Sequence, residues 1–229
     1  WVQSWGDPWA DDIGLRGFRK IRANKSEKRI LEEADHVFYV SMPTLERMRE
    51  KNPKLATKMN YLPRGFIQEV KSKLNSDSNR FIISYTGVLN KSRNIINLLE
   101  AIKLYNKNNA VKFLINIYGY CDEQTREKLL DYNNFVKVFP PISYEKIIEV
   151  YKTTHALLFI SNEKGAHQIP GKLYDYFGTD KSILAVVDNL RDSVSQFIES
   201  KRRTILVENN IKNLVKGIEL LKEDITRGN

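Results

Sequence analysis

A polar loop that leads into a helix is the part of this sequence best suited to bind a phosphate-bearing ligand. Residues 161–168 are polar and follow an apolar run, and Pro170 and Gly171 then favour the start of a helix. Backbone N–H groups at a helix start lack partners within the helix, and the helix dipole makes this end positive, so it attracts phosphate. Asp175 lies about one turn further on. Its carboxylate can accept hydrogen bonds from the vicinal hydroxyls of a ribose, or it can simply complement the helix dipole.

Two glycines mark further places where backbone can approach a ligand. Gly87 and Gly119 each follow a short apolar run, and Gly87 opens a loop that leads into a helix. Arg93, near the end of this loop, can hold phosphate oxygens in a bidentate fork. The spacing is neither a P-loop nor GxGxxG. The same residues therefore also fit a glycine turn with two solvated basic side chains.

The hydrophobic pattern predicts the elements that must position these residues. From residue 80 onward, short apolar runs predict six β-strands, at 81–86, 113–118, 135–139, 156–160, 183–187 and 204–207. Between these runs, apolar residues recur at helical spacing. Apolar strands that alternate with helices indicate a parallel sheet covered on both faces. We therefore predict a doubly wound α/β domain, in which ligands bind beyond the carboxyl ends of the strands.

The first third of the chain has fewer strands. Runs at 1–5, 37–40 and 60–62 predict strands, with helical stretches between them. Because two or three strands are too few for a complete domain of this class, we expect residues 1–67 to be the C-terminal part of an incomplete second α/β domain. The polar stretch 68–79 then reads as a linker, and residues 80–229 as the doubly wound domain.

Composition limits the class of protein. Of the 229 residues, 41% are hydrophobic and 28% are charged, which is typical of a globular protein. The single Cys121 excludes an internal disulfide and favours a reducing, cytoplasmic setting. The formal charge of +9 is scattered along the chain, and no RNA-binding or zinc-finger signature accompanies it, so we expect no nucleic acid as a partner. The basic residues suit a solvated surface or contact with anionic lipid headgroups.

Four stretches together resemble glycosyltransferase family 4, a group of enzymes with the GT-B fold. The stretches are residues 33–41 (EADHVFYVS), 61–66 (YLPRGF), 85–94 (YTGVLNKSRN) and 169–185, which begins with IPGKLYDYF. The likeness rests on the order and spacing of all four. The resemblance implies a Rossmann-like GT-B C-terminal domain that binds a nucleotide-sugar donor over residues 80–229. It assigns residues 1–67 to the acceptor-side domain.

The resemblance also implies roles for the donor-binding residues. Arg93 matches the basic residue that grips the donor diphosphate. Asp175 matches the second acid of the E-x7-E motif, which binds the ribose, and His167 stands where the first acid would contact the sugar. A second basic residue of the family is replaced by Val88. Phosphate binding would then depend on Arg93, on Lys172 and on the backbone amides of Ala166, His167 and Gln168.

The loop around Asp7 resembles the acceptor-side loop of the family. The stretch Trp5–Trp9 reads WGDPW, in which Asp7 would face the donor as a catalytic residue, and Gly6 stands where a His is often found. The residues alone also fit an Asp that caps a turn before Pro8.

By the same resemblance, the chain is a retaining, metal-independent hexosyltransferase. It would move a sugar from a UDP- or GDP-sugar to a glycan or lipid-linked acceptor in cell-surface polysaccharide synthesis. No residues have metal-ligand spacing, and no cofactor is expected. The enzyme would work in the cytoplasm or at the inner face of the cell membrane, where its basic residues suit peripheral contact with anionic lipid.

Two other functions are compatible with the same fold. A nucleotide-sugar epimerase would use acid and base side chains from the missing part of the second domain. A non-catalytic GT-B domain that binds a partner subunit would explain why Val88 and His167 depart from the donor-binding pattern.

Overall fold

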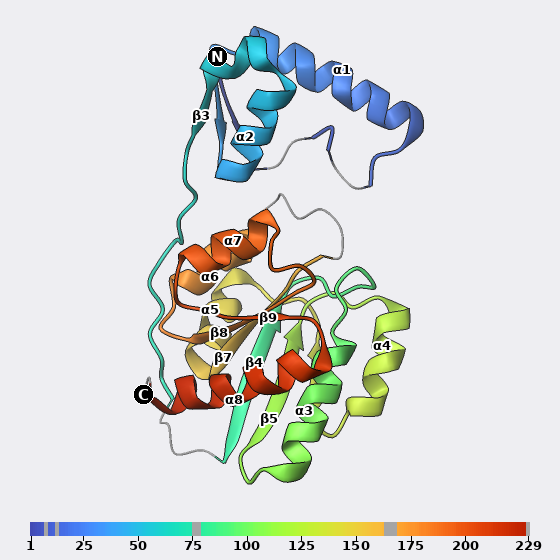
Figure 1. Cartoon of the computed structure of the whole chain (residues 1–229), viewed down its shortest axis with the longest axis vertical. Helices are drawn as coiled ribbons and strands as arrows, with labels where there is room; N and C mark the ends of the chain where they lie inside the picture. Colours follow the sequence, from blue (N-terminus) through green and yellow to red (C-terminus); the bar gives the residue numbers. More distant parts are fainter. Residues whose placement is uncertain (7–8, 12–13, 75–78, 163–168, 228–229) are drawn as a thin grey trace. The chain divides into compact units, whose positions relative to one another are not determined.

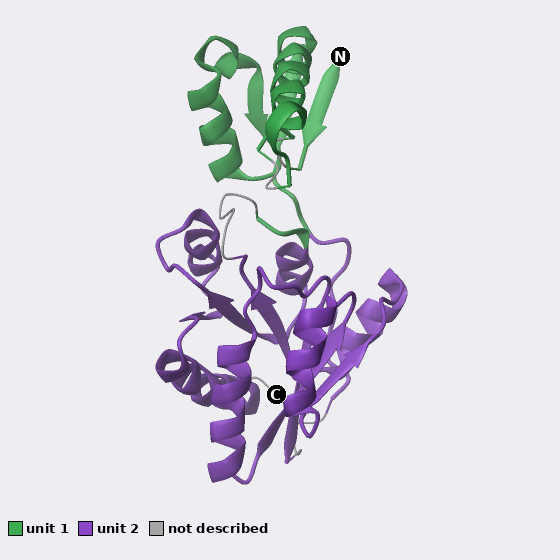
Figure 2. Cartoon of the chain, turned by 90° about the vertical axis from the view of Figure 1, so that its right-hand side faces the viewer, with its two compact units in different colours: residues 1–65, 164–171 green, residues 66–163, 172–229 purple. Residues whose placement is uncertain are grey.

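The computed structural model describes residues 1–6, 9–11, 14–74, 79–162 and 169–227. The chain divides into two compact units, which are residues 1–65 with 164–171 and residues 66–163 with 172–229 (Figure 2). Each unit contains its own parallel sheet, of three and of six strands respectively. No helix in the described part of the chain is long and apolar enough to cross a membrane.

The larger unit is built on the six-stranded sheet, whose strand order is β6-β5-β4-β7-β8-β9 (Figure 1). All pairs are parallel, and the strands are β4 (Arg80–Thr86), β5 (Lys112–Tyr118), β6 (Val136–Phe139), β7 (Ala156–Ile160), β8 (Ser182–Val187) and β9 (Ile205–Glu208). The predicted doubly wound sheet is therefore confirmed.

Helices cover the sheet because every strand-to-strand connection in this unit is a crossover. Right-handed crossovers place α3 (Ile96–Asn108) and α4 (Glu123–Leu129) on one face, and α5 (Tyr144–Thr153), α6 (Gly171–Phe177) and α7 (Ser193–Ser200) on the other. The final helix α8 (Ile211–Arg227) packs against α3. The β7 strand is buried along its whole length, as its apolar sequence predicts, and the main core lies between the sheet, α3 and α8.

Strand order also locates the place where a ligand can enter. From β4 the chain first runs outward to β5 and β6, then returns to β7 and continues to β8 and β9 on the other side. The connections that leave β4 and β7 therefore diverge, and they open a crevice at the carboxyl ends of these two strands. The candidate loops after β4 and β7 both begin at this point.

Part of the polar stretch expected as a linker lies along the larger unit. The backbone N–H of Val70 donates to the Gly178 carbonyl oxygen at 2.9 Å. The backbone N–H of Ser72 donates to the Asp180 carboxylate at 2.7 Å, and Lys181 Nζ donates to Ser72 Oγ at 2.6 Å. Residues 70–72 are thus bonded to the loop between α6 and β8.

The smaller unit contains the strands expected in the first third of the chain. Its sheet has the order β1-β2-β3, formed by β1 (Val2–Trp5), β2 (His36–Tyr39) and β3 (Met59–Tyr61). Two helices, α1 (Gly17–Glu33) and α2 (Met42–Lys51), supply Leu31, Leu45 and Met48 to a small core of its own. The buried Glu27 accepts a hydrogen bond from the Ala10 backbone N–H at 2.8 Å and pairs with Lys51, so its charge is compensated.

Candidate functional site

Two glycines shape the crevice because the loops after β4 and β5 touch there. Gly87 has φ +120° and Gly119 has φ +144°, a region that side chains disfavour. The Gly87 backbone N–H donates to the Tyr118 carbonyl oxygen at 2.9 Å. A Cβ on Gly119 would lie only 2.1 Å from the Gly87 carbonyl oxygen. Sequence reasoning expected these glycines to let a ligand approach, and the structure adds that they let the two loops approach each other.

The loop after β4 is fastened to the start of α4. The Leu89 backbone N–H donates to the Tyr120 carbonyl oxygen at 2.8 Å, and the Asp122 backbone N–H donates to the Leu89 carbonyl oxygen at 3.3 Å. One carboxylate oxygen of Asp122 caps α4 by accepting from the Thr125 N–H at 2.8 Å, and the other accepts from the Lys91 N–H at 2.9 Å. These bonds, the one from Thr125 foremost, lower the pKa of Asp122.

Sequence reasoning missed Asp122 as part of the candidate site. A signal for half of its role was present, because an Asp three residues before a Thr at the start of a helical stretch is typical of an N-cap. Nothing in the sequence indicates the second bond, which joins residues 31 positions apart.

Arg93 lies in the same loop and is bonded within it. Its backbone N–H donates to the Asn90 carbonyl oxygen at 2.8 Å, and its guanidinium Nη1 donates to the Val88 carbonyl oxygen. The Tyr85 hydroxyl donates to the same Val88 oxygen at 2.7 Å. Burial raises the pKa of Tyr85 to about 12, against the opposing effect of the Arg93 charge. Arg93 Nε is buried and has no hydrogen-bond partner within the described part of the chain.

Lys172 brings α6 to the end of β4. Its Nζ donates to the Thr86 carbonyl oxygen at 2.9 Å and lies 3.9 Å from the centre of the Tyr85 ring. The same nitrogen would be 3.3 Å from a Cβ placed on Gly87. Burial, and then the Arg93 charge, lower the pKa of Lys172 to about 7. Two cationic side chains that are 79 positions apart in sequence thus meet beside the glycine that opens the loop.

Asp175 lies on α6 close to a buried cluster of hydroxyl groups. The Thr86 Oγ1 is 3.2 Å from both the Tyr151 hydroxyl and the Tyr176 hydroxyl. Asp175 is the neighbour of Tyr176 on α6, and burial, together with the Asp175 charge, raises the pKa of Tyr151. Strand β4 and helices α5 and α6 therefore converge at Thr86, which the sequence did not single out.

The segment after β7 also reaches the loop after β4. Ser92 Oγ donates to Asn90 Oδ1 at 2.6 Å and lies 3.5 Å from Asn162 Oδ1. The structure thus places four of the predicted residues, Gly87, Arg93, Gly119 and Lys172, around the carboxyl end of β4, and Asp175 nearby on α6.

The other predicted site residues lie outside the described part of the chain. They are Asp7, Ala166, His167 and Gln168. Among the described residues, no group of three or more His, Cys, Asp or Glu side chains could hold a metal ion.

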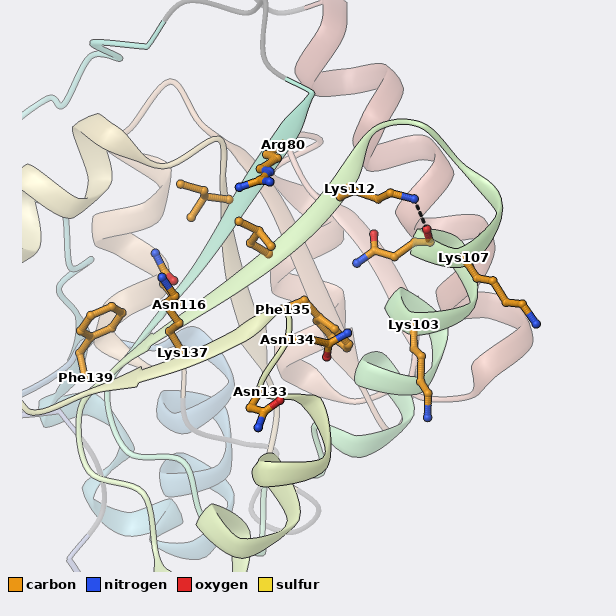
Figure 3. A pocket seen from close by; sticks show the side chains of 13 residues that line it. Arg80, Lys103, Lys107, Lys112, Asn116, Asn133, Asn134, Phe135, Lys137 and Phe139 are labelled. Carbon is orange, nitrogen blue, oxygen red and sulfur yellow. Dashed lines mark hydrogen bonds between the residues drawn. The ribbon is translucent and has the colours of Figure 1, made fainter.

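A cavity of about 640 Å³ lies away from this crevice, along the edge of the sheet formed by β5 and β6 (Figure 3). Three strands contribute to its lining: Arg80 lies at the start of β4, Lys112 lies at the start of β5, and Lys137 comes from β6. The Lys112 Nζ donates to the Asn109 carbonyl oxygen at 2.5 Å. None of the five candidate residues around β4 and α6 lines this cavity.

Most of the chain matches a known family of proteins. Residues 66–227 match the profile described as "Glycosyl transferases group 1". No curated protein matches the sequence.

Solved structures of similar fold include WaaG, a glycosyltransferase involved in lipopolysaccharide biosynthesis, with a TM-score of 0.73 at 11% identity. Sucrose-phosphate synthase from Thermosynechococcus elongatus has a TM-score of 0.61 at 16% identity. S. aureus MnaA, solved with UDP, has a TM-score of 0.57 at 12% identity.

The alignments with WaaG and MnaA cover 99% of this chain, and that with the synthase covers 98%. This chain spans 68%, 61% and 59% of the length of WaaG, MnaA and the synthase, respectively. At these identities the likeness shows the GT-B-like fold.

Proposed function

Because the chain belongs to the group 1 glycosyltransferases, we propose that it binds a nucleotide-diphosphate sugar at the carboxyl ends of β4 and β7. The observation that carries this proposal is the meeting of Lys172 and Arg93 beside Gly87. Two cations beside an exposed glycine, at the carboxyl ends of strands in a parallel sheet, suit a diphosphate. S. aureus MnaA, which has a similar fold, was solved with UDP.

In this proposal the cations take the part that a divalent metal ion plays in other enzymes. The pKa of Lys172 is lowered to about 7, so this side chain exchanges between its charged and neutral forms near pH 7, and an arriving diphosphate favours the charged form. The Arg93 guanidinium donates to the Val88 carbonyl oxygen. When phosphate oxygens replace this acceptor, Arg93 forms charge-assisted hydrogen bonds with a negatively charged partner. Both charges then stabilise the negative charge that grows on the nucleoside diphosphate as the glycosidic bond breaks. Asp175 accepts hydrogen bonds from the ribose hydroxyls.

The sugar would pass to a glycan or lipid-linked acceptor with retention of configuration, in cell-surface polysaccharide synthesis. WaaG, which has a similar fold, is a glycosyltransferase involved in lipopolysaccharide biosynthesis. The formal charge of +9 suits peripheral contact with anionic lipid at the inner face of the cell membrane. Asp7 is our candidate for the catalytic residue, and the amides of Ala166, His167 and Gln168 are our candidates for further phosphate contacts.

A thermal-shift screen against UDP, GDP, ADP and their sugars tests the donor site. A ligand present at 100 times its dissociation constant should stabilise the chain by roughly 2.7 kcal/mol. Arg93→Ala and Asp175→Ala should abolish the shift, whereas the exposed Arg227→Ala and Asp131→Ala should retain it. If no nucleotide raises the Tm, or if the first pair of variants responds like the wild type, the proposed site is wrong.

A further inference from the structure

The first half of α1 carries an exposed apolar pair on its outer face. The Phe18 side chain is 78% exposed and the Ile21 side chain is 67% exposed. The helix packs onto its own unit through Ala23, Glu27 and Leu31. At 3.6 residues per turn, Phe18 and Ile21 lie on the side of the helix opposite these three residues. They therefore cannot join the core that α1 already forms.

Basic side chains surround this apolar pair. Residues 14–26 contain no Asp or Glu, and they include five cations, Arg16, Arg19, Lys20, Arg22 and Lys25. All five are exposed, and no carboxylate of the described residues pairs with them. In the second half of the same helix, Lys28 pairs with Glu32 and Arg29 pairs with Glu33. The uncompensated charge is thus confined to the half that carries Phe18 and Ile21.

This combination fits one kind of partner. A protein surface that covered Phe18 and Ile21 would also bring the neighbouring cations out of water, which is costly unless each gains a counter-charge. An anionic lipid surface meets both needs, because its headgroups supply dense negative charge and its acyl boundary receives apolar side chains. Helices that carry cations around a small apolar face lie in the plane of the membrane interface.

We propose that the first half of α1 docks onto an anionic membrane surface, with Phe18 and Ile21 entering the headgroup layer between the flanking cations. This inference deepens the peripheral membrane contact of the proposed function and rests on it. It assigns that contact to one helix of the smaller unit, whereas Gly87, Arg93, Gly119, Lys172 and Asp175 belong to the larger unit.

Sedimentation with vesicles tests the assignment without any nucleotide. The chain should bind vesicles of phosphatidylcholine that contain about 30 mol% phosphatidylserine, and it should dissociate from them in high salt. Phe18→Ser combined with Ile21→Ser should weaken partitioning about tenfold. Arg19→Gln combined with Arg22→Gln should weaken it about five-fold for each cation removed.

Matched control variants distinguish the contribution of this helix from the general effect of removing any exposed cation or apolar side chain. Ile67→Ser with Leu130→Ser removes apolar side chains that are 78% and 64% exposed elsewhere, and should leave partitioning unchanged. Lys28→Gln with Arg29→Gln removes cations that already have Glu partners, and should have little effect. The nucleotide-induced shift of Tm should persist in every variant, so a failure of the donor site is recognised separately.

Three results would overturn the inference. The first is a wild-type chain that does not bind the anionic vesicles. The second is an equal loss of vesicle binding in the α1 variants and in their control variants. The third is a change in the monomer–dimer equilibrium of Phe18→Ser with Ile21→Ser, measured by sedimentation equilibrium, because it would make this face a contact between protein chains.

Discussion

Burial and the Arg93 charge oppose the charge of Lys172, whereas the Tyr85 ring and the Thr86 carbonyl oxygen favour it. Lys172 is half-buried, it faces the aromatic ring of Tyr85, and Arg93 is close enough to lower its pKa to about 7 together with burial. The Thr86 carbonyl is the acceptor that holds it in place. A cation of this kind responds both to pH and to an anion, which separates its role from that of an ordinary surface lysine.

The first prediction concerns the pH dependence of nucleotide binding. Because a diphosphate favours the charged form of Lys172, UDP affinity in the wild type should fall by several-fold between pH 7 and about pH 9 as the free chain loses this proton. Lys172→Arg stays charged over this range and should show a flatter profile, and Lys172→Met should bind weakly throughout. Isothermal titration calorimetry measures all three. Equal pH profiles for wild type and Lys172→Arg would contradict the assignment.

As pH rises, Lys172 should increase the stability of the folded chain, whereas it should decrease the affinity for UDP. The pKa of Lys172 is lower in the folded chain than in the unfolded chain, so between about pH 7 and pH 10 the unfolded state binds more protons. Stability from this group therefore rises with pH through that window. In urea unfolding, the wild type should gain more stability between pH 7 and pH 10 than Lys172→Met does.

Gly119 supports a prediction about the loop contact. An Ala there places a Cβ 2.1 Å from the Gly87 carbonyl oxygen, in a backbone conformation with φ +144°. We expect Gly119→Ala to destabilise the chain by about 2 to 4 kcal/mol and to displace the loop at Gly87. The matched control is Gly65→Ala, where a Cβ meets no atom within 4 Å. Urea unfolding of both variants checks the difference, and an equal stability would show that the loops can move apart freely.

At the scale of elements, α4 helps to hold the loop after β4 through Asp122. Ser is as good a helix N-cap as Asp, but it has one oxygen and cannot also reach Lys91. We expect Asp122→Ser to keep the Tm nearly unchanged, to raise amide hydrogen exchange at Lys91 and to weaken nucleotide binding several-fold. Asp122→Ala should in addition lose about 1 kcal/mol of stability.

The control for this prediction is a second Asp cap in the same unit. Asp192 caps α7 by accepting from the Ser195 N–H at 2.7 Å. Asp192→Ser should leave both the exchange at Lys91 and nucleotide binding as in the wild type. Unaltered exchange at Lys91 in Asp122→Ser would mean that the loop does not depend on this carboxylate.

At the scale of the whole chain, the two units have separate cores. Leu45 belongs to the core of the smaller unit, and Leu98 to that of the larger unit. Replacing either by Ala should cost about 2 to 5 kcal/mol in its own unit. We therefore expect calorimetry to resolve two transitions, of which Leu45→Ala lowers one and Leu98→Ala the other. UDP should raise only the transition that Leu98→Ala lowers, and a single transition shifted by both variants would contradict this.

The strands and the crevice were predictable from sequence because they depend on local pattern and chain order. Apolar runs such as 156–160 predict buried strands, and helical spacing between them predicts crossovers. Once the strands are parallel, the loops after 86 and 160 must open at the same edge. The likeness of residues 85–94 and 169–177 to glycosyltransferase family 4 added the expected chemistry, and the family is confirmed over residues 66–227.

The contacts within the site required the tertiary structure. Lys172 reaches Thr86 across 86 positions of sequence, Asp122 reaches Lys91 across 31, and the glycine loops meet with no signal in their spacing. Local propensity determines which residues form a strand or a helix, but side-chain packing between distant elements decides which polar atoms meet, how far a cation is dehydrated and therefore what its pKa becomes. By itself, then, the sequence determined the strands, the crevice and the chemical types around it, and only the packed chain decided their partners.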